Sequence, residues 1–190
     1  GEDDCFSKIF RRHGNLGWYS PANSAVYANH IGAMRDAIQT QLPITTHVAS
    51  SFEIATTGSS HQQSNGVTVI VAGRPFFRSK DLKDLAEQQG IAAALADGYA
   101  KCSHDIFKLL FGPFCCTIID TTADRVLIAI DRLGQEALYY RATDTALHFG
   151  SSAGMALAGD NGESTLLNQG IYNYLYFHMV PCPSSIYNGL

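Results

Sequence analysis

Cysteine and histidine are the side chains of this sequence best suited to nucleophilic, redox or metal chemistry. The five cysteines are odd in number and include no C-x-x-C pair, which argues against both a disulfide framework and a zinc site. Cys115 and Cys116 are neighbours in an apolar run, a position typical of buried and inert cysteines. His47, His61 and His148 are isolated along the chain and are more typical of core or surface residues than of catalytic bases or ligands. We therefore assign no metal site.

Charge and length restrict the partners of the chain. Its 190 residues, 46% of them hydrophobic, are enough for one domain with a buried core. Thirteen Lys and Arg against seventeen Asp and Glu give a net charge of −4, without a basic cluster that could follow a phosphate backbone. Nucleic acid is therefore not an expected partner. The acidic start of the chain, and the lack of an apolar stretch near the roughly 18 residues that span a bilayer, predict a cytoplasmic protein with no membrane partner.

Periodicity in the first half of the chain predicts two helical regions among short strands. Alternation at residues 5–10 indicates a strand, and apolar residues on one face of residues 24–42 indicate a helix that Pro43 stops. Residues 52–55 and 67–72 indicate two strands of one sheet, joined by a polar loop at residues 58–66. The elements that follow are a helix capped by Ser79 and starting at Lys80, a break at Gly90, and an alanine-rich helix at residues 91–100.

The second half of the chain predicts a run of antiparallel strands. Short connections between apolar segments are typical of a meander. The strands are expected at residues 111–120, 125–131, 138–141 and 147–151, with a turn at 121–124 and a last helix at 166–177. Pro181 and Pro183 then predict an extended tail. Strands, helices, strands and a closing helix together indicate two sheets with helices outside them.

Four blocks of the second half combine glycines, charged residues and aromatic rings in a specific order. They are GYAKCSHDIFKLLFGPFCCTIID at 98–120, VLIAIDRLGQEALYY at 126–140, LHFGSSAGMALAG at 147–159 and YNYLYFHMVPCPSSIYNGL at 172–190. In this order they resemble the asparagine synthetase family, whose glutaminase domain carries the patterns L-x-G-x-F-A-F-A-I-W-D and A-R-D-R-F-G-x-K-P-L-Y-Y. The residues that match these two patterns are Leu110, Gly112, Phe114, Asp120, Asp131, Arg132, Gly134, Leu138, Tyr139 and Tyr140.

The resemblance, which covers roughly residues 67–190, implies a fold and an enzyme architecture. The implied fold is α+β, the N-terminal-nucleophile (Ntn) hydrolase αββα sandwich of two antiparallel sheets between helical layers, which agrees with the order of elements above. Residues 1–190 would form one class II glutamine amidotransferase domain, followed in the natural protein by a C-terminal synthetase domain in cis. ATP and Mg²⁺ are expected only in that synthetase domain, and no cofactor is expected in this one. Glutamine and a second copy of the chain are further candidate partners.

The nucleophile that the resemblance implies is a cysteine at the mature N-terminus, whose free α-amine serves as its general base. Cys5 is the candidate, but Gly1, Glu2, Asp3 and Asp4 precede it, and a phenylalanine follows where the family has glycine. Two interpretations stay open. Either a four-residue leader is removed, or Cys5 is an ordinary strand residue.

The glutamine clamp that the resemblance implies is largely replaced. The family motif Asn-Gly-Glu aligns with Ala72, Gly73 and Arg74, so that only the glycine is kept and the acidic charge is reversed. Ser51 stands where the family has the arginine that pairs with the glutamine carboxylate, and Ile91 where it has the aspartate that binds the α-amine. The family motif His-Arg-Gly-Pro-Asp-Gly is also missing after the first helix. These departures predict weak or absent glutamine hydrolysis.

Three functions are weighed against one another on this basis. The first is a degenerate glutaminase-type domain that serves as a scaffold for an ATP-dependent amide-forming enzyme. The second is an active, glutamine-hydrolysing domain that uses Cys5 after removal of the leader. The third is an Ntn hydrolase for another amide, with Arg74 facing an anionic substrate.

Two structural expectations follow from the matched blocks. Asp131, Arg132 and Gly134 should shape the turn between two core strands, because a charged pair next to glycine suits a hydrogen-bonded corner. Residues 181–190 should pack poorly, since in the family they lead toward a partner domain.

Overall fold

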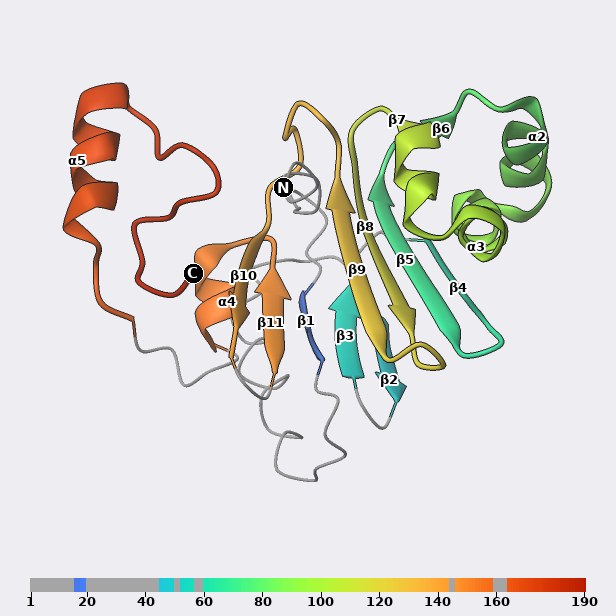
Figure 1. Cartoon of the computed structure of the whole chain (residues 1–190), viewed down its shortest axis with the longest axis horizontal. Coiled ribbons are helices and arrows are strands. Elements are labelled where there is room, and N and C mark those ends of the chain that lie inside the picture. Colours follow the sequence, from blue (N-terminus) through green and yellow to red (C-terminus); the bar gives the residue numbers. More distant parts are fainter. Residues whose placement is uncertain (1–15, 20–44, 50–51, 57–59, 144–145, 159–163) are drawn as a thin grey trace.

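The structure is a computed structural model that describes residues 16–19, 45–49, 52–56, 60–143, 146–158 and 164–190. The strand predicted at 5–10 and the helix predicted at 24–42 lie outside these residues. Within them the chain is α+β, with two antiparallel sheets at the centre of the molecule and helices at the sides (Figure 1). This confirms the predicted class and the antiparallel character of the sheets.

The strands form two main sheets and one small ribbon, all antiparallel. The four-stranded sheet has the order β4 (Ser60–Ser64), β5 (Val67–Gly73), β8 (Phe114–Asp120) and β9 (Arg125–Ile130). The five-stranded sheet has the order β10 (Tyr139–Ala142), β11 (Leu147–Gly150), β1 (Leu16–Tyr19), β3 (Phe52–Thr56) and β2 (Thr45–Ala49). The ribbon pairs β6 (Phe76–Phe77) with β7 (Leu110–Phe111).

Strand β8 lies between two hydrophobic cores and is buried along its whole length. Its Phe114, Cys116 and Ile118 belong to the core shared with the helices, whereas Cys115 and Ile119 belong to the core shared with the other sheet. This division follows from the two-residue period of a strand, which sends successive side chains to opposite faces. A strand covered on both faces reads in sequence as a nearly continuous apolar run, as FCCTII does here, with only the buried Thr117 interrupting it.

The helical side of the four-stranded sheet is covered by α2 (Lys80–Gln89), α3 (Ile91–Cys102) and the 3₁₀ helix η2 (Ser103–Leu109), at the right of Figure 1. Gly90 separates α2 from α3 with a φ of 94°, which confirms the predicted break. Ser79 stands at the N-cap of α2 as predicted, but its side chain makes no capping hydrogen bond. Instead its carbonyl oxygen accepts a hydrogen bond from the N–H of Lys83 at 3.0 Å.

The hairpin of β4 and β5 corrects two predictions. Residues 58–66 were expected to form only a loop, yet most of them form β4 and the turn that joins it to β5. Asn65 and Gly66 both have positive φ, 50° and 77°, as a two-residue type I′ hairpin turn requires. Because this turn pairs β5 with β4, and β3 pairs with β1 and β2, the two predicted strands at 52–55 and 67–72 lie in different sheets.

Two predictions for the second half of the chain are corrected. The strand predicted at 111–120 is two strands, and the strands of the predicted meander belong to two different sheets. Gly112, with a φ of 83°, and Pro113, which has no N–H to donate, separate β7 from β8. The meander is wrong between β9 and β10, because β8 and β9 belong to one sheet and β10 and β11 to the other. The remaining strands and the turn at 121–124 are confirmed within one or two residues.

The C-terminal region contains α4 (Ala153–Ala158), which packs on β10 and β11, and α5 (Asn168–Phe177). The tail after α5 folds back on the start of this helix, so the expectation of poor packing is wrong for its second half. The N–H of Leu167 donates to the oxygen of Ile186, and the N–H of Asn188 to that of Thr165, both at 2.8 Å. A Cβ at Gly170 would lie 2.6 Å from the oxygen of Ser185, so the glycine admits this close contact.

The corner after β9 confirms its prediction. Its residues run from Asp131 to Glu136 and include Arg132 and Gly134. The buried Asp131 carboxylate accepts hydrogen bonds from the backbone N–H groups of Leu133, Gln135 and Glu136, at 3.1, 3.0 and 3.1 Å. Its own N–H donates to the Phe114 oxygen at 3.2 Å, which ties the corner to β8. The side chain of Asp131 thus fixes the turn through which the chain leaves the four-stranded sheet.

Asp131→Ala should therefore destabilise the fold strongly. Loss of the carboxylate leaves three backbone N–H groups without their acceptor, and we expect the free energy of unfolding to fall by about 2–4 kcal/mol. Urea denaturation followed by circular dichroism measures this change. Glu87→Ala, which removes only an exposed i,i+4 pair with Lys83, should cost less than about 0.5 kcal/mol. Equal losses in the two variants would contradict the role of the corner.

A second buried carboxylate joins the helical layer to β8. The hydroxyl of Tyr99 in α3 donates to Asp120 Oδ2 at 2.9 Å. Asp120 Oδ1 also accepts from the hydroxyl of Thr122 at 2.6 Å and from the N–H of Ala123 at 2.9 Å. Burial alone would raise the pKa of Asp120, but these hydrogen bonds together outweigh it and hold the pKa below its ordinary value. Burial, followed by the bond to Asp120, raises the pKa of Tyr99, so its phenol stays protonated.

The lowered pKa of Asp120 predicts a loss of stability in acid. Because the folded-state pKa lies below the ordinary 3.8, the contribution of the carboxylate is complete above that pH and is lost as pH falls through the folded value. We expect the stability difference between the wild type and Asp120→Asn to shrink as pH is lowered from about 6 to about 3. Urea denaturation at each pH measures it. Asp97→Asn, at an exposed pair with Lys101, is the control and should show little difference at any pH.

Candidate functional site

Three strands of the four-stranded sheet come together where β5 ends. Gly73 pairs with Phe114 at the start of β8, and the N–H of Asp131, just after β9, donates to the Phe114 oxygen. The N–H of Arg74 donates to the oxygen of Pro113 at 2.8 Å, so the chain stays paired one residue beyond β5. This edge of the sheet holds three of the residues that the family alignment selected, Ala72, Gly73 and Arg74.

Gly73 occupies a position that only glycine fits. Its φ is 92°, and a Cβ there would lie 2.4 Å from the oxygen of Pro113 and 3.0 Å from the Cα of Phe114. Both obstacles are backbone and cannot rotate away. Ala72, by contrast, is only 4% exposed and belongs to the core between the sheets. Its methyl group offers no hydrogen bond to a ligand.

Arg74 is exposed beside this edge, and two further arginines lie near it on the aromatic ring of Phe111. The Cζ of Arg78 lies 4.0 Å and that of Arg132 5.7 Å from the ring centroid. The Phe76 ring stacks on Phe111 at 6.0 Å between centroids. In the part of the chain that the structure describes, no ion pair joins Arg74, Arg78 or Arg132 to a carboxylate. The edge is therefore basic.

Arg78 was not among the residues selected from the sequence. The signal for it was present, since two arginines four residues apart flank the pair Phe76–Phe77. Stacking on an aromatic face leaves the in-plane N–H groups of a guanidinium available to an anion. In the family, this edge carries a glutamate that binds an ammonium group. Here the exposed arginines give the same edge the chemistry of an anion-binding surface.

The remaining aligned residues do not complete the site. Ile91 is the first residue of α3, and its side chain packs against the core between the sheet and the helices. Ala72 faces the opposite side of the same sheet, so the structure does not bring the two side chains together. Cys5 and Ser51 lie outside the described residues.

Other groups with reactive chemistry are buried or dispersed. Cys115 and Cys116 are completely buried, as predicted, and burial raises the pKa of the Cys116 thiol far above its ordinary range. In the described ranges no three His, Cys, Asp or Glu side chains are grouped so that they could hold a metal ion. No helix in these ranges has both the length and the apolar character that crossing a bilayer requires.

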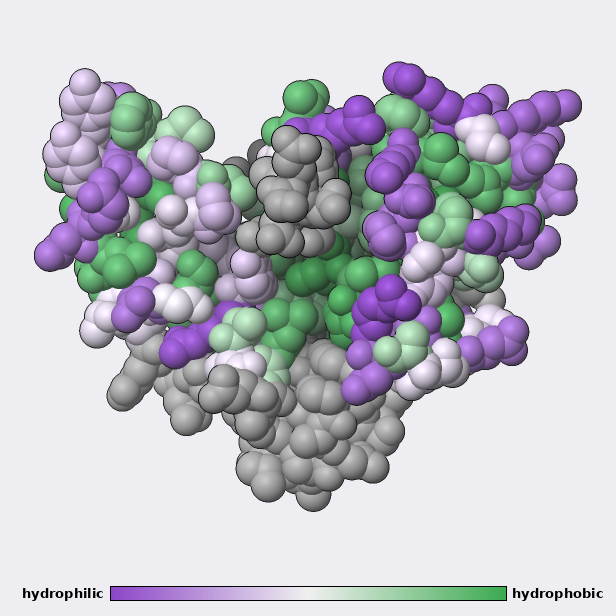
Figure 2. All heavy atoms as spheres, in the orientation of Figure 1, coloured by the Kyte–Doolittle hydropathy of each residue, from purple (hydrophilic) through white to green (hydrophobic). Residues whose placement is uncertain are grey.

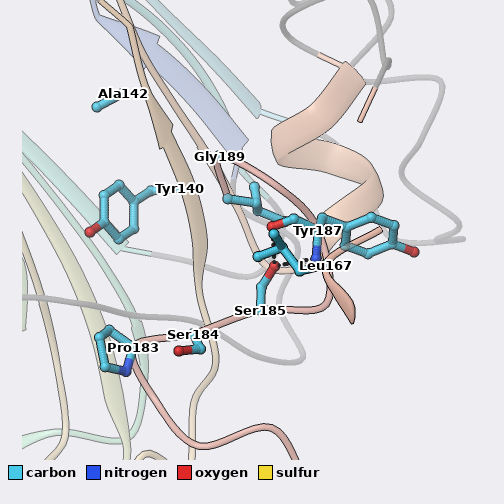
Figure 3. A pocket seen from close by; sticks show the side chains of 9 residues that line it. Tyr140, Ala142, Leu167, Pro183, Ser184, Ser185, Tyr187 and Gly189 are labelled. Atoms are coloured by element: carbon cyan, nitrogen blue, oxygen red, sulfur yellow. Dashed lines mark hydrogen bonds between the residues drawn. The ribbon is translucent and has the colours of Figure 1, made fainter. Parts of the chain in front are cut away.

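A shallow pocket of about 330 Å³ lies between β10 and the C-terminal tail (Figure 3). Its lining includes the rings of Tyr140 and Tyr187 and the hydroxyl of Ser185, but none of the aligned site residues. The Ser185 hydroxyl accepts from the N–H of Tyr187 at 2.8 Å and donates to the oxygen of the same residue at 3.0 Å. Both bonds hold the tail in shape, and we assign this serine a structural role.

Comparison with known proteins identifies one family. A family model described as "Glutamine amidotransferase domain" matches residues 84–190, which is more than half of the chain. The match includes β8, β9, the Asp131 corner and the tail, whereas Ala72, Gly73 and Arg74 precede it. No curated protein matches the chain.

The backbone geometry at Gly73 predicts the effect of a single methyl group. Gly73→Ala should lower the free energy of unfolding by about 2 kcal/mol or more, because the positive φ and the contact with Pro113 are both unfavourable for alanine. Gly154→Ala is the matched control. A Cβ at Gly154 meets nothing within 4 Å and lies in α4, so this variant should gain up to about 1 kcal/mol. Thermal denaturation of both variants tests the pair, and an unchanged Gly73→Ala protein would refute the close approach.

Proposed function

The chain belongs to the glutamine amidotransferase domain family, and on this premise we propose that it is the glutaminase-type domain of an asparagine synthetase-like, ATP-dependent amide-forming enzyme, with its own glutamine hydrolysis weak or lost. The observation that carries the second part is the burial of Ala72 at the position of the family's side-chain donor. In this role the domain is a scaffold for the synthetase domain.

Hydrolysis of an amide needs donors aimed at the oxyanion of the tetrahedral intermediate. Ala72 has no donor, and removal of one such donor typically costs about 10²–10³ in kcat. The N–H of Arg74 does not substitute for it, because the oxygen of Pro113 already accepts its hydrogen bond. Of the family motif Asn-Gly-Glu only the glycine is kept, as Gly73. This favours a domain that has kept the fold of the family over one that has kept a working oxyanion hole.

Recognition of glutamine is weakened at two further positions. Arg74 brings a cation to the place where the family has a glutamate, and a guanidinium repels the ammonium group of a free amino acid. Ile91 supplies no carboxylate and packs into the helical core on the other side of the sheet. Each loss acts on binding, independently of the loss at Ala72.

The finer fold and the larger assembly belong to the same proposal. We infer the Ntn-hydrolase αββα sandwich for residues 1–190 as one domain, supported by two antiparallel sheets that share a core and by helices packed on each of them. A synthetase domain would follow in cis and would bind ATP and Mg²⁺, while this domain binds no cofactor. Glutamine is at most a weak ligand, nucleic acid and membranes are not partners, and the cytoplasm is the compartment we expect.

Glutamate release from glutamine tests the proposal directly. The protein is prepared with its native N-terminus and also as a chain that starts at Cys5, so that the nucleophile and the clamp are tested separately. We expect neither form to exceed its Cys5→Ala variant by more than background. Release at several turnovers per second from the chain starting at Cys5, abolished by Cys5→Ala, would establish the alternative of an active glutaminase.

A charge reversal tests the clamp itself. In the chain starting at Cys5, Arg74→Glu restores the acidic group of the family motif at an exposed position, and we expect calorimetry to show tighter glutamine binding than in the parent. Lys80→Glu makes the same charge change at the start of α2 and should leave glutamine binding as in the parent. Equal binding in the two variants would mean that net charge, and not the position of Arg74, controls it.

A further inference from the structure

The ribbon of β6 and β7 carries two aromatic rings on its outer face. Its register pairs Phe76 with Phe111 and Phe77 with Leu110. Paired residues of antiparallel strands share a face, and successive residues alternate between faces. Phe77 and Leu110 belong to the core shared with α2 and α3, so the other pair lies on the opposite face of the ribbon. There Phe76 is 53% exposed, and its ring offers a surface on which a planar group can stack.

Close packing holds this exposed ring in place. The ring of Phe76 stacks on that of Phe111 with 6.0 Å between centroids and 27° between planes. It also lies beside Gly112, where a Cβ would be 3.1 Å from the nearest ring carbon of Phe76 and 2.7 Å from the oxygen of Arg74. Glycine at this position therefore admits both contacts. Because the ring is already held by its neighbours, little side-chain entropy remains to be lost when a ligand binds.

Two guanidinium groups flank the rings. The Cζ atoms of Arg78 and Arg132 both lie near the centroid of Phe111, at 4.0 and 5.7 Å. The two groups are therefore within about 10 Å of each other, which is the Debye length at 0.1 M salt, so that their repulsion is only partly screened. Within the described ranges neither guanidinium forms an ion pair with a carboxylate. An anion bound between them would relieve this repulsion.

We propose that the outer face of this ribbon binds a nucleoside polyphosphate, with the base stacked on Phe76 and the phosphates held by Arg78 and Arg132. This inference goes beyond the proposed function, in which ATP is bound by the synthetase domain. Bound at the ribbon, the nucleotide is an effector of this domain and not a cofactor of its chemistry. The exposed Arg74, whose carbonyl oxygen lies close to Gly112, adds a third positive charge beside the ligand.

Both parts of such a ligand find a complementary group on the ribbon. Every base has a π-face that can stack on an aromatic side chain, and guanidinium groups form paired hydrogen bonds with phosphate oxygens. The surface over β6, β7 and α2 is mixed accordingly, with hydrophilic and hydrophobic residues side by side at the upper right of Figure 2. An acidic peptide would pair with the arginines but would bring no planar group to the ring of Phe76. A long nucleic acid is disfavoured by the net charge of −4.

Calorimetric titration with ATP, with tripolyphosphate and with adenosine, all in EDTA, tests the two parts separately. We expect ATP to bind more tightly than either fragment. Phe76→Leu removes the aromatic face and should weaken ATP binding about 10-fold while leaving tripolyphosphate binding unchanged. Arg78→Gln should weaken the binding of both anions about 10-fold or more, and Arg132→Gln repeats this test at the second guanidinium. Arg125→Gln is the matched control, because Arg125 is exposed at the other end of β9, and it should leave both affinities unchanged.

Circular dichroism and thermal denaturation accompany the titrations, since all the substituted side chains are exposed and the fold should be unchanged. Lack of ATP binding up to millimolar concentration would overturn the proposal. So would tripolyphosphate binding as tight as that of ATP, or an equal loss in the Arg78→Gln and Arg125→Gln variants. Tighter binding of hexaglutamate than of ATP would assign the arginines to an acidic protein partner instead. These titrations measure no glutamine hydrolysis, so the failure of this proposal and that of the proposed function are separable.

Discussion

The burial of β8 on both faces is the constraint on which the rest of the structure depends. One strand contributes alternate side chains to two cores, one shared with α2 and α3 and the other with the five-stranded sheet. A shift of its register by a single residue would exchange these two sets of side chains. Both ends of the strand are accordingly fixed by polar contacts. Asp120 is held by Tyr99 and the following turn, and the residues around Phe114 are held by Gly73, Arg74 and Asp131. The candidate site therefore lies where β8 is anchored most closely to its neighbours.

Local chemistry in the sequence predicted most of the elements but not how the strands divide between sheets. The apolar run of β8, the break at Gly90 and the Asp131 corner could all be recognised, because each depends on residues close together in the chain. Strand β4 was missed, since its SHQQS sequence lacks the apolar alternation of a typical strand. The Asn65–Gly66 pair was the available signal, because it favours a type I′ turn. The assignment of β3 and β5 to different sheets depends on pairing between distant segments, which periodicity does not encode.

The candidate site shows the same division between local and distant information. Ala72, Gly73 and Arg74 are adjacent in sequence, so they lie together at one sheet edge. Ile91 lies on the other side of that sheet, and only the packing of α3 determines this. The stacking of Arg78 and Arg132 on Phe111 likewise joins three segments that are separate in the chain. The chemical character of the edge, basic and aromatic, therefore emerges from the tertiary structure more than from any single motif.

The turn at Asn65–Gly66 bears on the order in which the four-stranded sheet assembles. Its hairpin closes a loop of only two residues, and hairpins of this kind form in about 1–10 μs. Strand β8 must be brought in from a distance of some fifty residues, as the hydrogen bond between Thr121 and Gly66 across 55 positions illustrates. The entropy of closing so long a loop makes that step the slower one. We therefore expect the β4–β5 hairpin to form first and β8 to pair with it afterwards. The same turn then also binds the residue that follows β8, because the oxygen of Gly66 accepts hydrogen bonds from both the N–H and the hydroxyl of Thr121 at 2.9 Å.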